Sequence, residues 1–234
     1  MKIIEWNIRQ GGGTRINQII KDILNHDSDY YVLTEYRNNE NGRKLIESMT
    51  ENGYVQHFAL QTDKNKNTVM IGSKHNFSAK VYNTELEDEY FRVIRIENEE
   101  IILYGAYFPQ KNEKKRIFEF LLKEMALETT KPTLFIGDFN TGKPFADEVK
   151  NTFYCSQYMD AIEQRGYVDA WRFIHHDERE YTWYSNKGNG FRVDHAFINS
   201  NYKNNIVVCN YSHNERINKS SDHSLIAIEV ATKI

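Results

Sequence analysis

The chain has 234 residues, of which 40% are hydrophobic and 27% are charged, and its net charge at pH 7 is −3. This length favours one domain, residues 1–234, that is large enough to bury a sizeable core. The charge balance gives no overall basic field, which argues against non-specific nucleic-acid binding but allows a local basic groove. No apolar run is long enough to span a membrane, so we expect no membrane association.

The N-terminal run and the cysteines indicate a cytoplasmic protein. Glu5, Asn7 and Arg9 interrupt the run, which therefore does not form the apolar region of a secretory signal. Cys155 and Cys209 lack the spacing of a metal site or a redox motif. This usage is typical of free thiols in a reducing compartment.

The first half of the chain alternates between predicted strands and helices. Ile16, Ile19, Ile20 and Ile23 recur at helical spacing, which predicts an amphipathic helix that Thr14 caps. The other elements expected here are a helix around residues 45–49, a hairpin turn at 98–100, and strands at 2–7, 30–34, 54–60, 69–73, 91–97 and 101–107.

The second half adds helices at 116–127, 158–164 and 169–174, and strands at 133–136, 193–198, 206–211 and 224–230. Strands outnumber helices, and the helices are scattered among them. This pattern predicts two packed sheets with helices outside rather than a doubly wound parallel sheet. The basic cluster Lys111, Lys114, Lys115 and Arg116 has two equally good interpretations, a solvated helix start or a phosphate-facing patch.

Polar residues stand at or beside the ends of several predicted strands. Asp138 and Asn140 follow the apolar run at 133–136, and His223 belongs to a Ser-Asp-His motif near the C-terminus. A carboxylate and an amide suit a hard cation or a phosphate, and histidine adds a titrating group. Each motif alone is more often a turn or a cap. Their joint occurrence in one chain favours a catalytic site.

These motifs together resemble the endonuclease/exonuclease/phosphatase superfamily, most closely its exonuclease III-like branch. The matching residues cover essentially the whole chain and are Trp6-Asn7, Thr34-Glu35, Tyr107-Phe108-Pro109-Gln110, Gly137-Asp138-Phe139-Asn140, Val168-Asp169-Ala170-Trp171-Arg172, Tyr181-Thr182-Trp183, Arg192-Val193-Asp194 and Ser221-Asp222-His223. The resemblance implies a DNase I-like, four-layer α/β sandwich, in which helices flank two packed, mainly antiparallel sheets. It also implies metal-dependent phosphodiester hydrolysis by loops at one end of the sheets.

The resemblance also implies which residues hold the metal ion. Glu35 matches the principal metal ligand of the family, Asn7 lies beside it, and Asp222 matches a second-site or outer-sphere ligand. Magnesium suits such a site because it takes oxygen ligands, keeps several waters and needs only one or two carboxylates. We expect Mg²⁺ as the cofactor, with Mn²⁺ able to replace it.

The remaining matches carry catalytic roles. Asp138 matches the residue that orients or deprotonates the attacking water, and Asn140 matches a partner of that group or of the phosphate. His223 matches a phosphate-contacting histidine, and Asp194 matches the carboxylate that fixes the tautomer of such a histidine. Tyr107 matches a tyrosine whose hydroxyl reaches the phosphate or the leaving oxygen. Asp169, Trp171 and His195 are interpreted as structural residues.

Three departures from the family bear on the substrate. Thr34 replaces the usual glutamine before Glu35, and the triple glycine at 11–13 is either a flexible loop or backbone that approaches phosphate closely. Arg9 precedes these glycines, within reach of substrate. The stretch from Trp183 to Asp194 is shorter than in abasic-site endonucleases, which leaves abasic-site specificity open. Trp183 and Phe191 still suit an apolar wall for a sugar or a base.

Three functions compete. The first is a magnesium-dependent DNA nuclease of exonuclease III type, a 3′–5′ exonuclease, an abasic-site endonuclease or both, acting as a monomer in DNA repair. The second is a phosphatase or phosphodiesterase for a small or lipid phosphate, which the acidic net charge keeps open. The third is a non-catalytic binding module, which has no reason to retain the complete polar set. Trp183 and Phe191 favour a nucleic-acid partner, as do the basic residues after Gln110.

Overall fold

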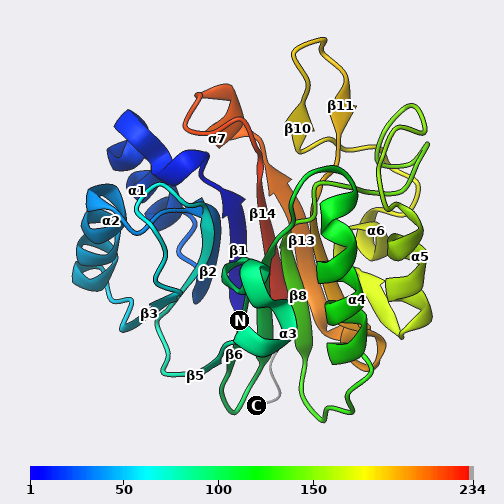
Figure 1. The fold of residues 1–234 in the computed structure, drawn as a ribbon, viewed down its shortest axis with the longest axis horizontal. Coiled ribbons are helices and arrows are strands. Elements are labelled where there is room, and N and C mark those ends of the chain that lie inside the picture. The colour runs from blue at the N-terminus through cyan, green and yellow to red at the C-terminus, as the bar shows by residue number, and fades with distance from the viewer. Residues whose placement is uncertain (232–234) are drawn as a thin grey trace.

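The computed structural model describes residues 1–231 and consists of two six-stranded sheets packed face to face, with helices on the outer faces (Figure 1). The first sheet has the order β13-β14-β1-β2-β4-β3, and its strands are β1 (Lys2–Asn7), β2 (Tyr30–Tyr36), β3 (Gln56–Ala59), β4 (Thr68–Ser73), β13 (Ile206–Ser212) and β14 (Leu225–Val230). The second sheet has the order β5-β6-β7-β8-β12-β9, and its strands are β5 (Ser78–Lys80), β6 (Val93–Glu97), β7 (Ile102–Tyr107), β8 (Thr133–Asp138), β9 (Tyr167–Asp169) and β12 (Asp194–Asn199).

Each sheet is antiparallel except for one central parallel pair, β1 with β2 and β7 with β8. A two-stranded hairpin, β10 (Trp183–Tyr184) and β11 (Gly190–Phe191), stands apart and projects at the top of Figure 1. The helices are α1 (Ile16–Asn25), α2 (Glu40–Glu51), α3 (Asn83–Leu86), α4 (Lys115–Glu124), α5 (Gln157–Gln164), α6 (Ala170–His175) and α7 (Asn214–Ile217). The prediction of two packed, mainly antiparallel sheets flanked by helices is therefore confirmed.

Three apolar layers hold the sandwich together. Residues such as Ile3, Val32 and Ile136 fill the space between the sheets. The isoleucines of α1 and Leu45 of α2 pack on the outer face of the first sheet. Phe118 of α4 packs on the outer face of the second sheet. Both faces of the central strands are covered, which explains why their sequences are continuous apolar runs.

Four details differ from the sequence-based expectations. Thr14 does not cap α1, because a 3₁₀ segment (Gln10–Arg15) precedes the helix and its first residue has no side-chain cap. Phe91 and Arg92 belong to another 3₁₀ segment, so β6 begins only at Val93. Lys114 is buried rather than solvated, at the start of α4. The short elements β5, β9, α3 and α7 were not predicted at all.

Within residues 1–231, no helix combines the length and the apolar character needed to cross a membrane.

Candidate active site

The strand directions bring the polar motifs to one end of the sandwich. Asn7 ends β1, and Tyr107 and Asp138 end the parallel strands β7 and β8. Asp194 begins β12, which runs antiparallel to β8 and pairs Asp194 directly with Asp138. His223 precedes β14, which runs antiparallel to β1. Because the two sheets face each other, these strand ends lie together at one end of the sandwich, the upper end in Figure 1.

The side chain of Asn7 joins the two sheets. Its Nδ2 donates to Asp138 Oδ2 at 2.9 Å and to Glu35 Oε1 at 3.3 Å. Its Oδ1 accepts the backbone N–H of Arg9 at 2.9 Å. The amide therefore holds two carboxylates from different sheets close to one another, and its oxygen is already used by the backbone.

Glu35 lies on an irregular part of β2. The pairing with β4 shifts register between Leu33 and Tyr36, and Glu35 has a φ of 55°, a left-handed conformation that is uncommon for a residue with a side chain. Such strain is found mostly at functional sites. Four donors hold the carboxylate: Asn7 and Tyr107 OH at 3.3 Å each, the Gln10 backbone N–H at 2.8 Å and Asn67 Nδ2 at 3.0 Å.

The triple glycine makes one of these contacts possible. Gly11, Gly12 and Gly13 all have positive φ, between 51° and 77°. This left-handed turn presents the Gln10 N–H to Glu35. Glycine is favoured at Gly12 mainly for conformation, because its φ of 77° is uncommon for a residue with a side chain; an added Cβ would also come within 2.9 Å of the terminal Cδ1 of Ile19.

Asp138 and Asn140 form a second strained turn. Asn140 has a φ of 52°, and its backbone N–H donates to Asp138 Oδ1 at 2.9 Å. Its Nδ2 donates to the Phe108 carbonyl at 2.8 Å, and the Gln110 amide donates to its Oδ1. Lys114 Nζ donates to the Asn140 carbonyl. All polar groups of Asn140 are thus used, which fixes the turn.

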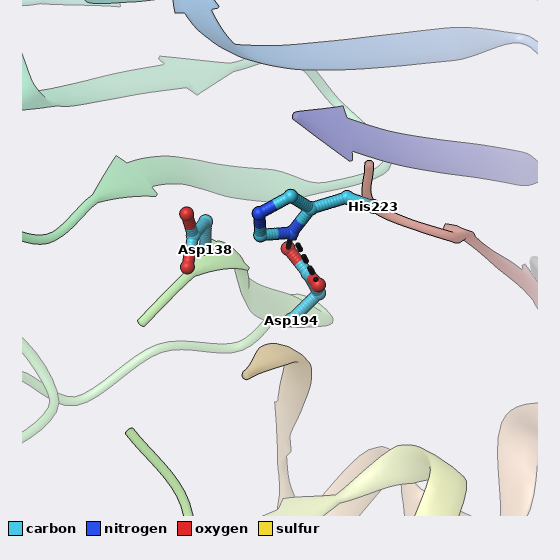
Figure 2. A group of neighbouring side chains, drawn as sticks. All are labelled: Asp138, Asp194 and His223. Atoms are coloured by element: carbon cyan, nitrogen blue, oxygen red, sulfur yellow. Dashed lines mark hydrogen bonds and ion pairs between the residues drawn. The ribbon is translucent and has the colours of Figure 1, made fainter. Parts of the chain in front are cut away.

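His223 and Asp194 form a buried pair (Figure 2). His223 Nδ1 lies 3.1 Å and 3.0 Å from the two carboxylate oxygens of Asp194. Burial alone lowers the pKa of His223, but the charge and hydrogen bond of Asp194 outweigh this effect and raise the pKa to about 10. The imidazole is therefore protonated at neutral pH, with Nε2 available to a substrate.

Asp138 lies next to this ring, and Asp138, Asp194 and His223 each offer one ligand atom within 4.8 Å of the other two (Figure 2). Burial and, after it, the nearby Asp194 carboxylate together raise the pKa of Asp138 to about 7. Such a value places the change of charge of Asp138 in the range where a general base acts.

Glu5 is a third buried carboxyl group near the site, besides Asp138 and Asp194. Its Oε1 accepts from Thr34 Oγ1 at 3.0 Å, and its Oε2 has no partner. Burial raises its pKa well above the ordinary value, and Asp194 and Asp138 raise it further. Thr34, the departure from the family pattern, is therefore the hydrogen-bond partner of a buried acid.

The cluster opens into a cavity of about 440 Å³. Trp183 and Phe191 line it, with ring centroids 5.8 Å apart. Glu35, Asp138 and His223 line it as well. A larger hollow of about 810 Å³ near Arg95 lies at the opposite ends of the same strands, away from these groups.

Two predicted residues lie at the rim of this cavity. Asp222 Oδ2 accepts from Trp183 Nε1 at 3.4 Å and lies 3.9 Å from Arg9 Nε. The structure gives Asp222 no hydrogen bond to Asn7 or Glu35, the other two expected metal ligands. The Arg9 side chain is mostly exposed.

A buried ionic network stabilises the segment that carries Asp194. Arg192 bonds Asp147 at 2.8 Å and Asp169 at 2.6 Å, and His195 Nε2 lies 2.9 Å from the Thr141 carbonyl. Because Arg192 stands two residues before Asp194, this network fixes the start of β12. The structural interpretation of Asp169 and His195 agrees with these contacts.

The sequence reasoning missed several site residues. Asn67 carries no motif and reaches Glu35 from the residue before β4. Lys114, in contrast, belongs to the basic cluster for which a phosphate-facing role was left open, and it lines the cavity. Phe153 and Tyr154 line the cavity from the loop after β8. An aromatic pair in a polar loop was the only sequence signal for the last two.

Comparison with known proteins identifies the family. A sequence model of the Endonuclease/Exonuclease/phosphatase family matches residues 4–223, so the chain belongs to this family. The structure is similar to the Neisseria 3′ phosphatase NExo bound to a product DNA hairpin, with 20% identity, a TM-score of 0.84 and 99% of each chain covered. It is also similar to the 3′–5′ exonuclease NExo of Neisseria meningitidis (21% identity, TM-score 0.83, 98% of this chain and 99% of the other). An AP endonuclease from Archaeoglobus fulgidus is a third similar structure (21% identity, TM-score 0.79, 98% and 99%).

The family match confirms the expected superfamily, and the similar structures confirm its α/β sandwich. The chain is an enzyme of the phosphodiesterase and nuclease class, and dependence on a divalent metal is typical of the family.

The donor set fits such a cation. Glu5, Glu35, Asp138 and Asp194 bring four carboxyl groups to one end of the sandwich, and among residues 1–231 His223 is the one cation that bonds any of their side chains. Oxygen donors with excess negative charge are what magnesium requires. Of the candidates, Glu35 is partly exposed and faces the cavity, whereas a protonated His223 does not bind a metal.

Proposed function

We propose that the protein is a magnesium-dependent DNA nuclease of exonuclease III type that hydrolyses phosphodiester bonds at the 3′ ends of DNA. One observation carries this proposal: the Asn7 amide joins the Glu35 and Asp138 carboxylates across the two sheets, beside the His223–Asp194 pair. A metal-ligand carboxylate, a base and a cationic histidine are thereby held around one aromatic-walled cavity.

Glu35 is the proposed ligand of the metal, and Asn7 positions its carboxylate. Mn²⁺ is expected to replace Mg²⁺, because both accept carboxylate and water ligands. When bound, the cation neutralises charge on the phosphate as it develops during hydrolysis. Asp222 accepts a hydrogen bond from Trp183 and lies close to Arg9 at the rim of the cavity, which suits an outer-sphere role toward the metal ion.

The residues of the chain supply the remaining chemistry. Asp138 accepts a proton from the attacking water, and Asn140 holds the Asp138 carboxylate in place through its backbone N–H. His223, kept protonated and oriented by Asp194, donates from Nε2 to the phosphate and stabilises its negative charge. Burial raises the pKa of Tyr107, so its phenol stays protonated and remains a donor.

The walls of the cavity favour a nucleic acid. Trp183 and Phe191 offer apolar surface for a sugar or base, and Lys111 and Gln110 line the same cavity beside the catalytic groups. NExo, similar in fold, is a 3′ phosphatase and was solved with a product DNA hairpin. All proposed groups come from one chain, so the proposed site is complete without a second subunit; we expect a monomer.

A substrate panel in magnesium tests the proposal. It contains blunt and recessed duplex DNA, a 3′-phosphorylated end, an internal abasic site, single-stranded DNA, RNA and an inositol phosphate. We expect nucleotide release from DNA 3′ ends, which Asp138→Asn abolishes. Turnover of the inositol phosphate without any turnover of DNA would instead support the small-phosphate phosphatase.

A further inference from the structure

The segment Glu148–Tyr154 forms a rigid arch at the edge of the catalytic cavity. Glu148 is 2% exposed and pairs with Phe191 of the β10–β11 hairpin through an isolated antiparallel bridge. Its carboxylate accepts the backbone N–H groups of Thr152 at 2.6 Å and Phe153 at 2.9 Å, and the Thr152 hydroxyl. One buried acid therefore fixes the return of the loop toward the hairpin.

The end of the arch is fixed as well. Thr141, close after the catalytic turn at Asn140, donates its hydroxyl to the Tyr154 carbonyl at 2.9 Å. The Phe153 ring packs edge-on against Phe191, with centroids 5.6 Å apart. The Tyr154 backbone thus has little freedom, although its side chain remains 49% exposed and lines the cavity.

An exposed aromatic ring on a fixed backbone is a stacking surface that loses little conformational entropy on binding. Trp183, Phe191, Phe153 and Tyr154 continue around the cavity, whose volume lies within the range of small-molecule sites. Lys111 and Gln110 line the same space and suit a phosphate. The cavity thus combines surfaces for a base, a sugar and a phosphate.

We propose that Tyr154 is the stacking platform for the base of the nucleotide being removed, so that the enzyme distinguishes 3′ ends that carry a base from 3′ ends that have lost it. This inference rests on the proposed nuclease function and adds the specificity of the same site. The expected substrate is a base-bearing 3′-terminal nucleotide.

Kinetics with two matched substrates test the platform. One duplex ends in an ordinary 3′ nucleotide and the other in a tetrahydrofuran residue, which has no base. Tyr154→Ala should lower kcat/KM about 5- to 150-fold on the first substrate, the scale of one base–aromatic stack, and at most about twofold on the second. Tyr154→Phe should keep the preference, because its ring still stacks.

Phe145→Ala is the matched control. Phe145 is an exposed aromatic residue of the same loop, 62% exposed, but does not line the cavity. Its replacement should leave both rates unchanged. An equal decrease of kcat/KM on both substrates in Tyr154→Ala, or no decrease on the base-bearing substrate, would overturn the proposal.

A binding experiment separates this inference from the proposed function. A 3′-terminal 2-aminopurine should lose fluorescence when it binds to Asp138→Asn and lose less when it binds to Asp138→Asn combined with Tyr154→Ala. Equal quenching by both variants would refute stacking on Tyr154. A wild-type protein that quenches through Tyr154 but hydrolyses no DNA would retain the platform and refute the nuclease.

Discussion

Asn7 shows how the chemistry of one amide changes the interpretation of a site. The sequence suggests that Asn7 is a metal ligand. In the structure, Asn7 Oδ1 accepts the Arg9 N–H, and Asn7 Nδ2 donates to Asp138 and Glu35. Asn7 therefore holds two carboxylates at a fixed separation, and its Oδ1, which keeps a second lone pair, remains a predicted ligand of the cation. Glu35, which is partly exposed and faces the cavity, remains the best candidate for direct contact with the cation.

Replacement of Glu35 tests this assignment. Glu35→Gln should abolish magnesium-dependent turnover, as excess chelator does, because the carboxylate charge that binds the cation is lost. The melting temperature in chelator should change little, since glutamine keeps an acceptor for Gln10 and Asn67. Asp222→Asn is the control and should cost much less. Full activity of Glu35→Gln would show that Glu35 is not a ligand of the metal ion.

Asp194 and His223 should act as one unit. Because Asp194 both orients the imidazole and keeps it protonated, Asp194→Ala and His223→Ala should each lower kcat by about 10²–10⁴-fold. The double variant should be little worse than the worse single variant. Steady-state kinetics of the wild type, the two single variants and the double variant measure the coupling energy between Asp194 and His223. Losses that multiply would show that the two side chains act independently.

Glu5 gives a prediction about stability. Its pKa in the folded protein is raised above 4.5, so the folded state binds this proton more tightly than the unfolded chain. The stabilising contribution is complete below about pH 4.5 and is lost as the pH rises. Glu5→Gln removes the titration and should be more stable than wild type at pH 8 by about 1–3 kcal/mol, the scale of an unsatisfied buried group.

Urea unfolding at pH 5 and pH 8, both in chelator, measures this effect. The wild-type protein should lose stability between the two values more steeply than Glu5→Gln does. Parallel changes in the two proteins would mean that Glu5 does not titrate in this range.

At the scale of elements, the sequence predicts those strands and helices whose own residues carry the pattern. The strand 133–136 and the isoleucine-rich helix near residue 20 are found close to their expected positions. β9 was missed because its three residues form a strand only by pairing with β12. The 3₁₀ segment Gln10–Arg15 was missed because three consecutive glycines indicate a loop of any shape.

The same distinction applies to the site. Asp138, Asp194 and His223 could be identified because each belongs to a motif that the family resemblance carries. Glu148 and Tyr154 could not, because their positions depend on a bridge to Phe191 and on buried hydrogen bonds. Contacts between distant segments have no local signature in a single sequence.

The network behind the hairpin gives a prediction at this scale. Arg192→Leu leaves the buried Asp169 carboxylate without its arginine, whereas Asp147 keeps its ion pair with Arg172, and should lower the free energy of unfolding by about 3–5 kcal/mol. Arg179→Leu is the control, since Arg179 is exposed and, among residues 1–231, donates one side-chain hydrogen bond, to the Phe145 carbonyl. Its effect should stay within about 0.5 kcal/mol in urea unfolding. An unchanged free energy of unfolding in Arg192→Leu would mean that the network contributes little to the stability of the fold.

At the scale of the molecule, the sandwich brings the ends of two parallel strand pairs together and places four carboxyl groups beside one histidine. The overall charge of −3 provides little attraction for DNA. For the proposed nuclease, DNA binding should therefore depend on local cations such as Arg9 and Lys111 and on the expected metal ion. This arrangement also predicts the pH dependence of catalysis.

The rate should follow a bell-shaped curve. Asp138 must be ionised to accept a proton, so activity should rise through about pH 7, and His223 must be protonated, so activity should fall through about pH 10. Saturating metal should move the acidic limb to lower pH, because a cation favours ionised Asp138. Asp194→Asn should move the alkaline limb to lower pH, since Asp194 raises the pKa of His223. An alkaline limb that does not move would exclude His223 as its source.

The most direct measurement follows a 5′-labelled duplex with a recessed 3′ end, incubated with the purified protein in magnesium and, in parallel, in excess chelator. The account predicts stepwise loss of 3′-terminal nucleotides in magnesium and none in chelator or with Asp138→Asn. Undiminished shortening in chelator, or an intact duplex in magnesium with a folded protein, would contradict it.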